Sequence, residues 1–335
     1  MLHKYRFWLT AFPDINRPIG GIKQIHRLAE SLNILGHEAT IVQEDENFVP
    51  GWFQSSVSTI SKADWLKINC LDSQVDIIIM PETFLSVVSA YHPHIKKIIF
   101  NQNGSYTFGL NGVNEWNPSS VIKGYNHPSI HKVWCVSQYD YDLLSLIVTN
   151  HVKKVGLIAN GLEPICNIPK DSIKKYQICY MPRKNSRDSS IVSSLLKSQS
   201  WFHGWYLHPI QNLRHKQVIE VFQQSLIFLS FGHPEGFGLP VAEAMACGCA
   251  VVGYSGLGGR ELFQLAEHHQ LGIPVEFGDW IGFLIGVRSI IHSFNQFPSV
   301  HIANAHKLSS DILLSYGFDS MIKSVDNVLS DLYLD

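Results

Sequence analysis

The feature that most constrains how this chain can fold is the alternation of short apolar runs with segments of helical periodicity. In the first half of the chain, apolar runs predict β-strands at residues 7–12, 39–42, 75–80, 98–100, 132–136 and 154–158. Between them, apolar residues recur at helical spacing over residues 22–35, 84–91 and 138–148. Strands separated by helices pair in parallel through right-handed crossovers, so the sequence predicts a parallel sheet covered by helices.

The same alternation starts again in the second half of the chain. Strands are predicted at residues 177–181, 201–207, 225–230, 249–252 and 272–275, and helices at 189–197, 213–224, 240–247 and 259–266. Three helical segments follow, at 280–294, 300–314 and 318–332. A turn-rich stretch at 160–175 separates the halves. We therefore expect two doubly wound α/β domains, at residues 1–165 and 166–315, and a carboxyl-terminal helix at 316–335.

Composition excludes several classes of partner. Lys and Arg total 26 against 28 for Asp and Glu, so the chain lacks the basic excess of proteins that hold nucleic acid by its phosphates. The six cysteines are scattered and lack metal-ligand spacing, so we expect reduced thiols and no metal site. No uncharged apolar stretch reaches the roughly 20 residues that span a bilayer. These features predict a cytoplasmic protein, with room for a peripheral contact at the inner face of a membrane.

The most informative motif is the stretch from Pro234 to Gly248, which follows an apolar strand and opens a helix. Gly236 and Gly238 let the backbone approach a ligand, and the helix N-terminus that follows them favours an anion such as a phosphate. Glu235 lies before the helix and Glu243 inside it. Carboxylates beside a diphosphate should accept hydrogen bonds from hydroxyls. An anion site flanked by two hydroxyl-binding acids predicts a sugar nucleotide as ligand.

This stretch resembles a known family. Its E-x7-E spacing and the run E-G-F-G-L-P-x-x-E-A-M-A-x-G are similar to the donor site of retaining GT-B glycosyltransferases, in particular glycosyltransferase family 4. The S-G-L-G-G-R-E run at 255–261 is similar to the family's next turn, and I-G-G at 19–21 to its first glycine loop. N-G-L-E at 160–163 resembles the turn that closes the family's first domain. The matches keep the family's order over nearly the whole chain.

The resemblance implies a GT-B fold, with two Rossmann-like domains facing a cleft and a carboxyl-terminal helix that crosses back to the first domain. It implies transfer of a hexose from a nucleotide-diphosphate sugar, as co-substrate, to a glycan or lipid-linked acceptor, with no metal and no other cofactor. Glu235 and Arg183 take the catalytic positions, beside the hexose and the diphosphate. The positions that match donor-binding residues are Gly21, Lys184, Gly236, Phe237, Gly238, Leu239 and Glu243.

Two departures from the family pattern leave alternatives open. In the family, the phosphate-binding Arg is followed by a Lys. That Lys is missing after Arg183 here, and either Lys184 or Arg187 takes its place. The family's His after the fourth strand of the first domain is also missing, and Gln102 or Asn103 stands there to contact sugar or acceptor. An amide binds hydroxyls but does not titrate near neutrality, so catalysis should depend on positioning and on stabilisation of the leaving group.

Other interpretations compete with this one. The Asp140-Tyr141-Asp142 run has the D-x-D spacing of metal-dependent glycosyltransferases, but Ser137 stands where it would cap a helix that contains Asp140, so we expect a structural role. A non-hydrolysing sugar-nucleotide epimerase would use a similar cleft. A catalytically inactive nucleotide-sugar-binding protein is the third candidate, because of the missing His and Lys.

Overall fold

The structure is a computed structural model that describes residues 4–109, 117–149, 155–170 and 173–332. It divides into two compact units, Met1–Gly161 with Phe318–Asp335, and Leu162–Gly317. The boundaries lie four residues before the predicted 165/166 and two residues after the predicted 315/316. Hydrogen bonds agree with the first boundary. The backbone of Gly161 bonds to the side-chain amide of Gln24 in the first unit, and the N–H of Leu162 donates to the Tyr316 carbonyl in the second.

The first unit is built on a seven-stranded sheet in which every pairing is parallel, in the order β3-β2-β1-β4-β5-β6-β7. Its strands are β1 (Arg6–Thr10), β2 (Glu38–Gln43), β3 (Ser58–Ser61), β4 (Asp76–Pro81), β5 (Lys96–Asn101), β6 (Ile130–Cys135) and β7 (Val155–Leu157). The central strands are apolar because helices cover both faces of a parallel sheet. In register, Leu9 lies between Ile41 and Ile79, and all three side chains are buried.

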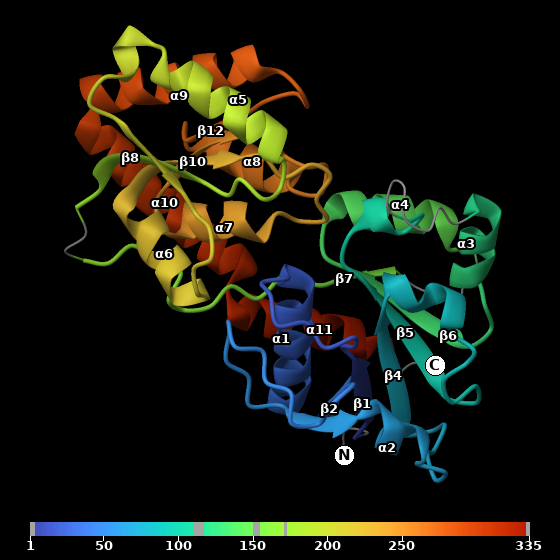
Figure 1. Cartoon of the computed structure of the whole chain (residues 1–335). Coiled ribbons are helices and arrows are strands. Elements are labelled where there is room, and N and C mark those ends of the chain that lie inside the picture. Colours follow the sequence, from blue (N-terminus) through green and yellow to red (C-terminus); the bar gives the residue numbers. More distant parts are fainter. Residues whose placement is uncertain (1–3, 110–116, 150–154, 171–172, 333–335) are drawn as a thin grey trace. The chain divides into compact units, whose positions relative to one another are not determined.

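The helical elements of the first unit include its carboxyl-terminal helix. They are α1 (Gly20–Ile34), α2 (Lys62–Leu66), α3 (Pro118–Tyr125), α4 (Gln138–Ile147), α11 (Phe318–Ser330) and the 3-10 turns η1 (Glu82–Val87) and η2 (Gly104–Tyr106). Helix α11 packs against α1 and β7, so segments from opposite ends of the chain lie side by side (Figure 1). Its apolar face of Met321, Val325 and Leu329 is buried. Gly156 in β7 makes room, since a Cβ there would come 2.8 Å from Val328.

The second unit has a five-stranded parallel sheet in the order β12-β11-β10-β8-β9. Its strands are β8 (Lys175–Tyr180), β9 (Tyr206–Pro209), β10 (Ser225–Ser230), β11 (Ala250–Gly253) and β12 (Gly272–Pro274). Its helices are α5 (Ser186–Lys197), α6 (His215–Gln224), α7 (Leu239–Ala246), α8 (Arg260–His268), α9 (Trp280–Gln296) and α10 (Pro298–Tyr316), with the 3-10 turn η3 (Ser200–Phe202). Strand β10 is completely buried.

Some local predictions were wrong. The predicted strand 201–207 is η3 followed by β9, because Gly204 adopts a left-handed φ of 88° that interrupts an extended run. The predicted helix 84–91 is the 3-10 turn η1. The elements β3, α2 and α3 were not predicted. The predicted strand 154–158 corresponds to β7, and its first residue, Lys154, lies outside the described residues.

Candidate functional site

The second unit has a topological switch point at the carboxyl ends of β8 and β10. From β8 the chain moves outward to β9 on one side, and it returns to β10 on the other side of β8. The loops that follow β8 and β10 therefore run in opposite directions and leave a crevice, where parallel sheets commonly bind ligands. The loop after β8 contains Arg183 and Lys184, and the loop after β10 contains Glu235. The topology thus brings together three of the predicted site residues.

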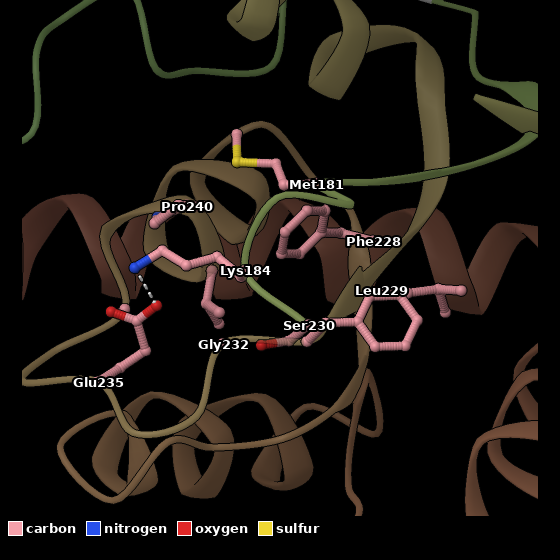
Figure 2. A pocket seen from close by; sticks show the side chains of 11 residues that line it. Met181, Lys184, Phe228, Leu229, Ser230, Gly232, Glu235 and Pro240 are labelled. Carbon is pink, nitrogen blue, oxygen red and sulfur yellow. Dashed lines mark ion pairs between the residues drawn. The ribbon is translucent and has the colours of Figure 1, made fainter. Parts of the chain in front are cut away.

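Lys184 and Glu235 form an ion pair at this switch point. The Nζ atom of Lys184 lies 2.5 Å from Oε1 of Glu235, and their side chains are 32% and 16% exposed. Figure 2 shows the two charges facing each other at the rim of a small cavity. The cavity is lined by Met181, Lys184, Phe228, Leu229, Ser230, Phe231, Gly232, Glu235, Gly238, Pro240 and Val241. A cation therefore lies beside a carboxylate that can accept hydrogen bonds from hydroxyls, and both side chains are partly buried.

Glycines hold Glu235 in place. A Cβ on Gly232 would lie 2.5 Å from Oε1 of Glu235, and one on Gly256 would lie 2.7 Å from the Glu235 Cβ. The backbone N–H of Glu235 donates to the Gly256 carbonyl at 2.7 Å, and the N–H of Gly258 donates to the Glu235 carbonyl at 3.1 Å. A Cβ on Gly258 would come 1.9 Å from the carbonyl oxygen of Gly236. The two glycine-rich stretches found in the sequence are therefore one interlocked structure.

Helix α7 begins directly behind Glu235. Gly238 precedes it with a left-handed φ of 92°, a conformation that glycine adopts without strain. Pro240 occupies the second helical position, one later than predicted, because the helix starts at Leu239. The first N–H groups of a helix have no intrahelical acceptor and favour an anion. The side chain of Phe237 is buried against the ring of Tyr316, 4.9 Å away between centroids, so only its backbone is suited to contact a ligand.

Glu243 lies on the side of α7 that meets α6. Its side chain is 6% exposed, and its Oε1 lies 2.8 Å from Nε2 of His215. Nδ1 of the same ring lies 3.4 Å from Oε2 of Glu163. Cys166, His215 and Glu243 form a group whose candidate metal-ligand atoms lie within 4.8 Å of one another. Zinc ligands at about 2.0 Å in tetrahedral geometry would stand roughly 3.3 Å apart, so the 2.8 Å contact fits a hydrogen bond better than two ligands of one ion.

The two candidates for the missing family Lys have different contacts. Lys184 points to Glu235, whereas the guanidinium of Arg187 lies over the ring of Trp280, 5.4 Å from its centroid. Arg183 is exposed on the same loop and does not line the cavity. Of the two alternatives, Lys184 is the one at the switch point.

In the first unit, Gly21 and Gln102 come together. Gly21 lies in the first turn of α1, and a Cβ there would come 2.8 Å from Oε1 of Gln102, so the glycine makes room for the amide. Helix α1 starts at Gly20, two residues before the predicted start. Asn103 has a different role: its side-chain oxygen accepts from the N–H of Ser105 at 3.0 Å and caps η2. Gln102 is therefore the amide that faces the glycine turn.

Sequence reasoning missed Glu82, which supports Gln102. Its Oε2 accepts the backbone N–H of Gln102 at 3.0 Å, although the two residues are 20 positions apart. Its side chain is buried where β4 ends, and burial raises the pKa of Glu82 to about 7. His215 was missed for the same reason, because its contacts join α6 to residues far along the chain. A single sequence contains no signal for either pairing.

The D-x-D run is part of the first unit's framework. Asp140 is completely buried, its N–H donates to the Ser137 hydroxyl at 3.2 Å, and its Oδ1 accepts the N–H of Gly104 at 2.8 Å. Asp142 accepts from the side chain of Gln138 at 2.7 Å. These contacts start α4 and attach η2 to it.

In the described part of the chain, no helix is both long enough and apolar enough to cross a bilayer.

Comparisons with known proteins bear on the second unit first. Residues 207–298, which contain β10, Glu235, α7 and the glycine turn after β11, match the family described as Glycosyl transferases group 1. Among curated proteins, an alpha-1,6-glucosyltransferase of Actinobacillus pleuropneumoniae serotype 7 is 28% identical over 216 residues. The match covers 63% of this chain and 60% of that protein, so the chain spans less than two thirds of its relative's length.

Solved structures share the fold over the whole chain. HepE of Anabaena, in complex with UDP-glucose, has a TM-score of 0.70 at 13% identity, covering 97% of this chain and 99% of its own. Sucrose-phosphate synthase of Thermosynechococcus elongatus also has a TM-score of 0.70, at 10% identity, covering 99% of this chain and 100% of its own. The fold is GT-B, as predicted. The chain therefore has the GT-B fold, and its second unit contains a region that matches the group 1 glycosyl transferases.

Proposed function

We propose that the protein transfers a hexose from a nucleotide-diphosphate sugar to a glycan or lipid-linked acceptor, with retention of configuration and without a metal ion. The observation that carries this proposal is the ion pair of Lys184 and Glu235 at the switch point, directly before α7. The cation and the helix N-terminus suit a diphosphate, and the carboxylate suits the hydroxyls of a sugar. A sugar nucleotide presents both groups side by side.

We infer that the donor is a UDP-linked hexose, with UDP-glucose the first to test. The printed name of the curated relative specifies glucosyl transfer, and HepE was solved with UDP-glucose. Both contribute support by analogy, at 28% and 13% identity. The acceptor would be a saccharide hydroxyl, presented on a glycan or on a lipid carrier.

The second unit supplies the residues for the donor. Glu235 accepts hydrogen bonds from the hexose, Lys184 and Arg183 neutralise the diphosphate, and Glu243 accepts from the ribose hydroxyls. The backbone from Gly236 to Leu239 lines the approach to the α7 terminus. In the first unit, we assign Gln102, above Gly21, to hydroxyls of the sugar or the acceptor.

The chemical step breaks the bond between the sugar's anomeric carbon and the diphosphate oxygen, and forms a bond from that carbon to the acceptor oxygen. The acceptor's proton passes to the departing diphosphate, so no side chain must titrate. Arg183, Lys184 and the α7 terminus stabilise the negative charge that develops on the leaving group. Positioning of acceptor and donor supplies the remaining rate enhancement.

The first experiment is a panel of nucleotide sugars, read by thermal shift and then by incubation with labelled donor. A bound donor raises the apparent melting temperature. We expect stabilisation by UDP-hexoses and then transfer of label to acceptor, or slow release of free sugar. Formation of an epimeric nucleotide sugar would replace this proposal with an epimerase, and binding without turnover across acceptors would replace it with a nucleotide-sugar-binding protein.

A further inference from the structure

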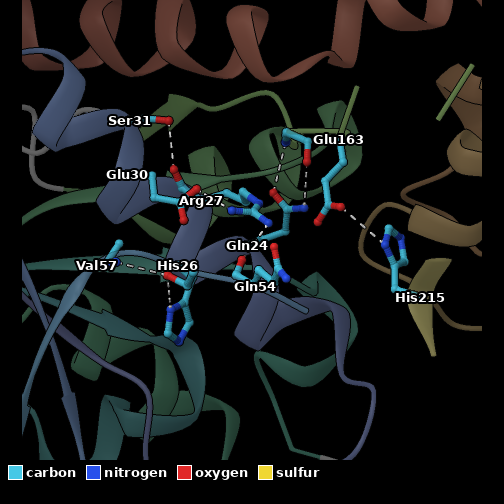
Figure 3. A network of polar contacts seen from close by, with 11 residues as sticks. Gln24, His26, Arg27, Glu30, Ser31, Gln54, Val57, Glu163 and His215 are labelled. Carbon is cyan, nitrogen blue, oxygen red and sulfur yellow. Dashed lines mark hydrogen bonds and ion pairs between the residues drawn. The ribbon is translucent and has the colours of Figure 1, made fainter. Parts of the chain in front are cut away.

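His215 is an imidazole held between two carboxylates. It is the first residue of α6, and its Nε2 lies 2.8 Å from Glu243 while its Nδ1 lies 3.4 Å from Glu163. Figure 3 shows the ring and Glu163 pointing at each other. The side chain of His215 is 12% exposed, and those of Glu163 and Glu243 are 21% and 6% exposed. The three groups therefore form a largely buried row that ends at α7.

The chemistry of the imidazole ring determines which groups of this row donate hydrogen bonds and which accept them. Carboxylate oxygens only accept hydrogen bonds when ionised, so a ring nitrogen that faces one must donate. With carboxylates at both nitrogens, the imidazolium satisfies both contacts, and a neutral ring satisfies one. A neutral ring with its proton on Nε2 still holds Glu243. In the imidazolium and in the neutral ring protonated on Nε2, His215 donates to Glu243 and limits the orientations that this carboxylate can adopt.

The turn that carries Glu163 is itself fixed within the second unit. The N–H of Leu162 donates to the Tyr316 carbonyl at 2.7 Å, and the N–H of Cys166 donates to the Glu163 carbonyl at 2.9 Å. Glu163 thus presents its carboxylate to Nδ1 from an anchored backbone. The row begins at an anchored turn and ends at the residue assigned to the ribose.

We propose that His215 is a positioning residue for the nucleotide, which fixes Glu243 in the orientation that accepts the ribose hydroxyls. This inference rests on the proposed function. An ionised carboxylate has about four acceptor positions, so a hydrogen bond from His215 is compatible with one from a hydroxyl. A carboxylate already oriented loses less conformational freedom when the nucleotide binds. His215 acts through Glu243 and makes no contact with the reacting atoms.

The test is a set of binding measurements by calorimetry with UDP, 2′-deoxy-UDP and 3′-deoxy-UDP. The full-length protein is compared with His215→Gln and with His203→Gln, an exposed histidine of the same unit. We expect His215→Gln to weaken UDP binding roughly tenfold. We expect the loss to shrink to about twofold or less with the analogue that lacks the hydroxyl bound by Glu243, because groups acting through one contact are not additive. His203→Gln should bind like the wild type.

The outcomes separate the two proposals. Equal losses with UDP and both analogues, or no loss at all, would overturn the positioning role and leave the proposed function standing. Failure of the wild-type protein to bind UDP or any nucleotide sugar would overturn the proposed function, and this inference with it. If His215→Gln does not fold, Glu163→Gln is measured instead. A smaller loss, about threefold, with the same dependence on a ribose hydroxyl supports the proposal, and its absence overturns it.

Discussion

At the scale of single residues, Lys184 and Glu235 combine a charge for the diphosphate with an acceptor for the hexose. We predict that Glu235→Gln mainly lowers kcat, and that Lys184→Met raises the KM for the donor and also lowers kcat, because Lys184 faces charge that develops on the leaving group. A hydrogen bond to a charged group contributes about 1.5–3 kcal/mol, which corresponds to about ten- to a hundredfold in either constant. Steady-state kinetics with a labelled UDP-hexose gives the two constants separately.

The matched controls are exposed residues of the same unit and the same chemical type. Glu267→Gln on α8 and Lys197→Met on α5 should retain wild-type kinetics. If Glu235→Gln and Lys184→Met behaved like these controls, the site would have to lie elsewhere than at the switch point.

Glu82 gives a prediction for pH dependence. Burial raises the pKa of Glu82 to about 7, so between about pH 4.5 and about pH 7 the folded chain holds a proton that the unfolded chain has lost. This carboxyl therefore contributes stability below about pH 4.5 that is lost as the pH rises through 7. The loss is on the order of 3 kcal/mol. Glu82→Gln should remove it, and the amide oxygen can still accept from the N–H of Gln102.

The measurement is the difference in apparent melting temperature between Glu82→Gln and the wild type, taken across this pH range. Taking the difference cancels the contributions of other groups to the pH dependence of stability. Examples are His26 and His301, whose pKa values burial lowers to about 4. The variant should gain stability relative to the wild type as the pH rises. A difference that stays constant with pH would contradict the protonation of Glu82 in the folded state.

The sequence predicted residues whose roles follow from a local motif, and missed residues whose roles depend on distant contacts. Glu235, Gly238 and Glu243 stand in one stretch of sequence that follows strand β10 and continues into helix α7. His215 and Glu82 each act on a residue 20 or more positions away, and no local pattern encodes that distance. The sequence could not separate Lys184 from Arg187, because both follow the same strand. They differ in their contacts, Glu235 for Lys184 and the Trp280 ring for Arg187.

At the scale of elements, α11 belongs to the first unit although it follows the second in the chain. An isolated helix of this length is marginal in water, so its stability comes from docking on α1 and β7. We predict that deletion of the residues after Tyr316 raises amide hydrogen exchange in α1, β7 and the strands β1 and β5. Exchange in β10 and β11 of the second unit is the internal control.

A milder change keeps this prediction testable if the truncated chain does not fold. Leu329 is 1% exposed in α11, and Leu329→Ala should cost about 2–5 kcal/mol by leaving a cavity. Increased exchange restricted to residues 162–317 in either variant would contradict the assignment of α11 to the first unit.

The predicted elements agree with the structure where apolar periodicity is strong. They differ where an edge position, a short length or a left-handed glycine decides the conformation. Strand β3 reads Ser-Thr-Ile-Ser and is only partly buried at the sheet edge, so it lacks an apolar signal. Helix α3 begins with Asn117 as cap and Pro118 in its first turn, but its eight residues are a short run in which to recognise helical periodicity. Residues 201–207 were predicted as one strand, but Gly204 interrupts it.

At the scale of the whole molecule, each unit places candidate ligand-binding residues at the carboxyl ends of parallel strands. That arrangement follows from the order of the strands in each sheet. The alternation of strands and helices in the sequence predicts a parallel sheet but does not predict this order. A cytoplasmic location, and any contact with a membrane surface, stay predictions. The GT-B fold itself was predictable because the motifs fall in the expected order along both halves.

Metal independence is a prediction about the whole reaction. We expect activity to survive EDTA, because Arg183, Lys184 and the α7 terminus provide positive charge for the diphosphate. Asp142→Asn should also retain activity, since this exposed carboxylate bonds to Gln138 within α4. Activity that disappears with EDTA and returns with Mn²⁺ or Mg²⁺ would contradict the proposal.

NMR of the sugar that the full-length protein releases or transfers from UDP-α-glucose in EDTA tests retention of configuration and the role of Glu235 together. Early time points report the configuration of the new bond before free sugar equilibrates. We predict an α-configured product, which Glu235→Gln forms about ten- to a hundredfold more slowly than the wild type does. A β-configured product, or equal product from Glu235→Gln, would contradict a retaining transferase whose donor site is built around Glu235 and Lys184.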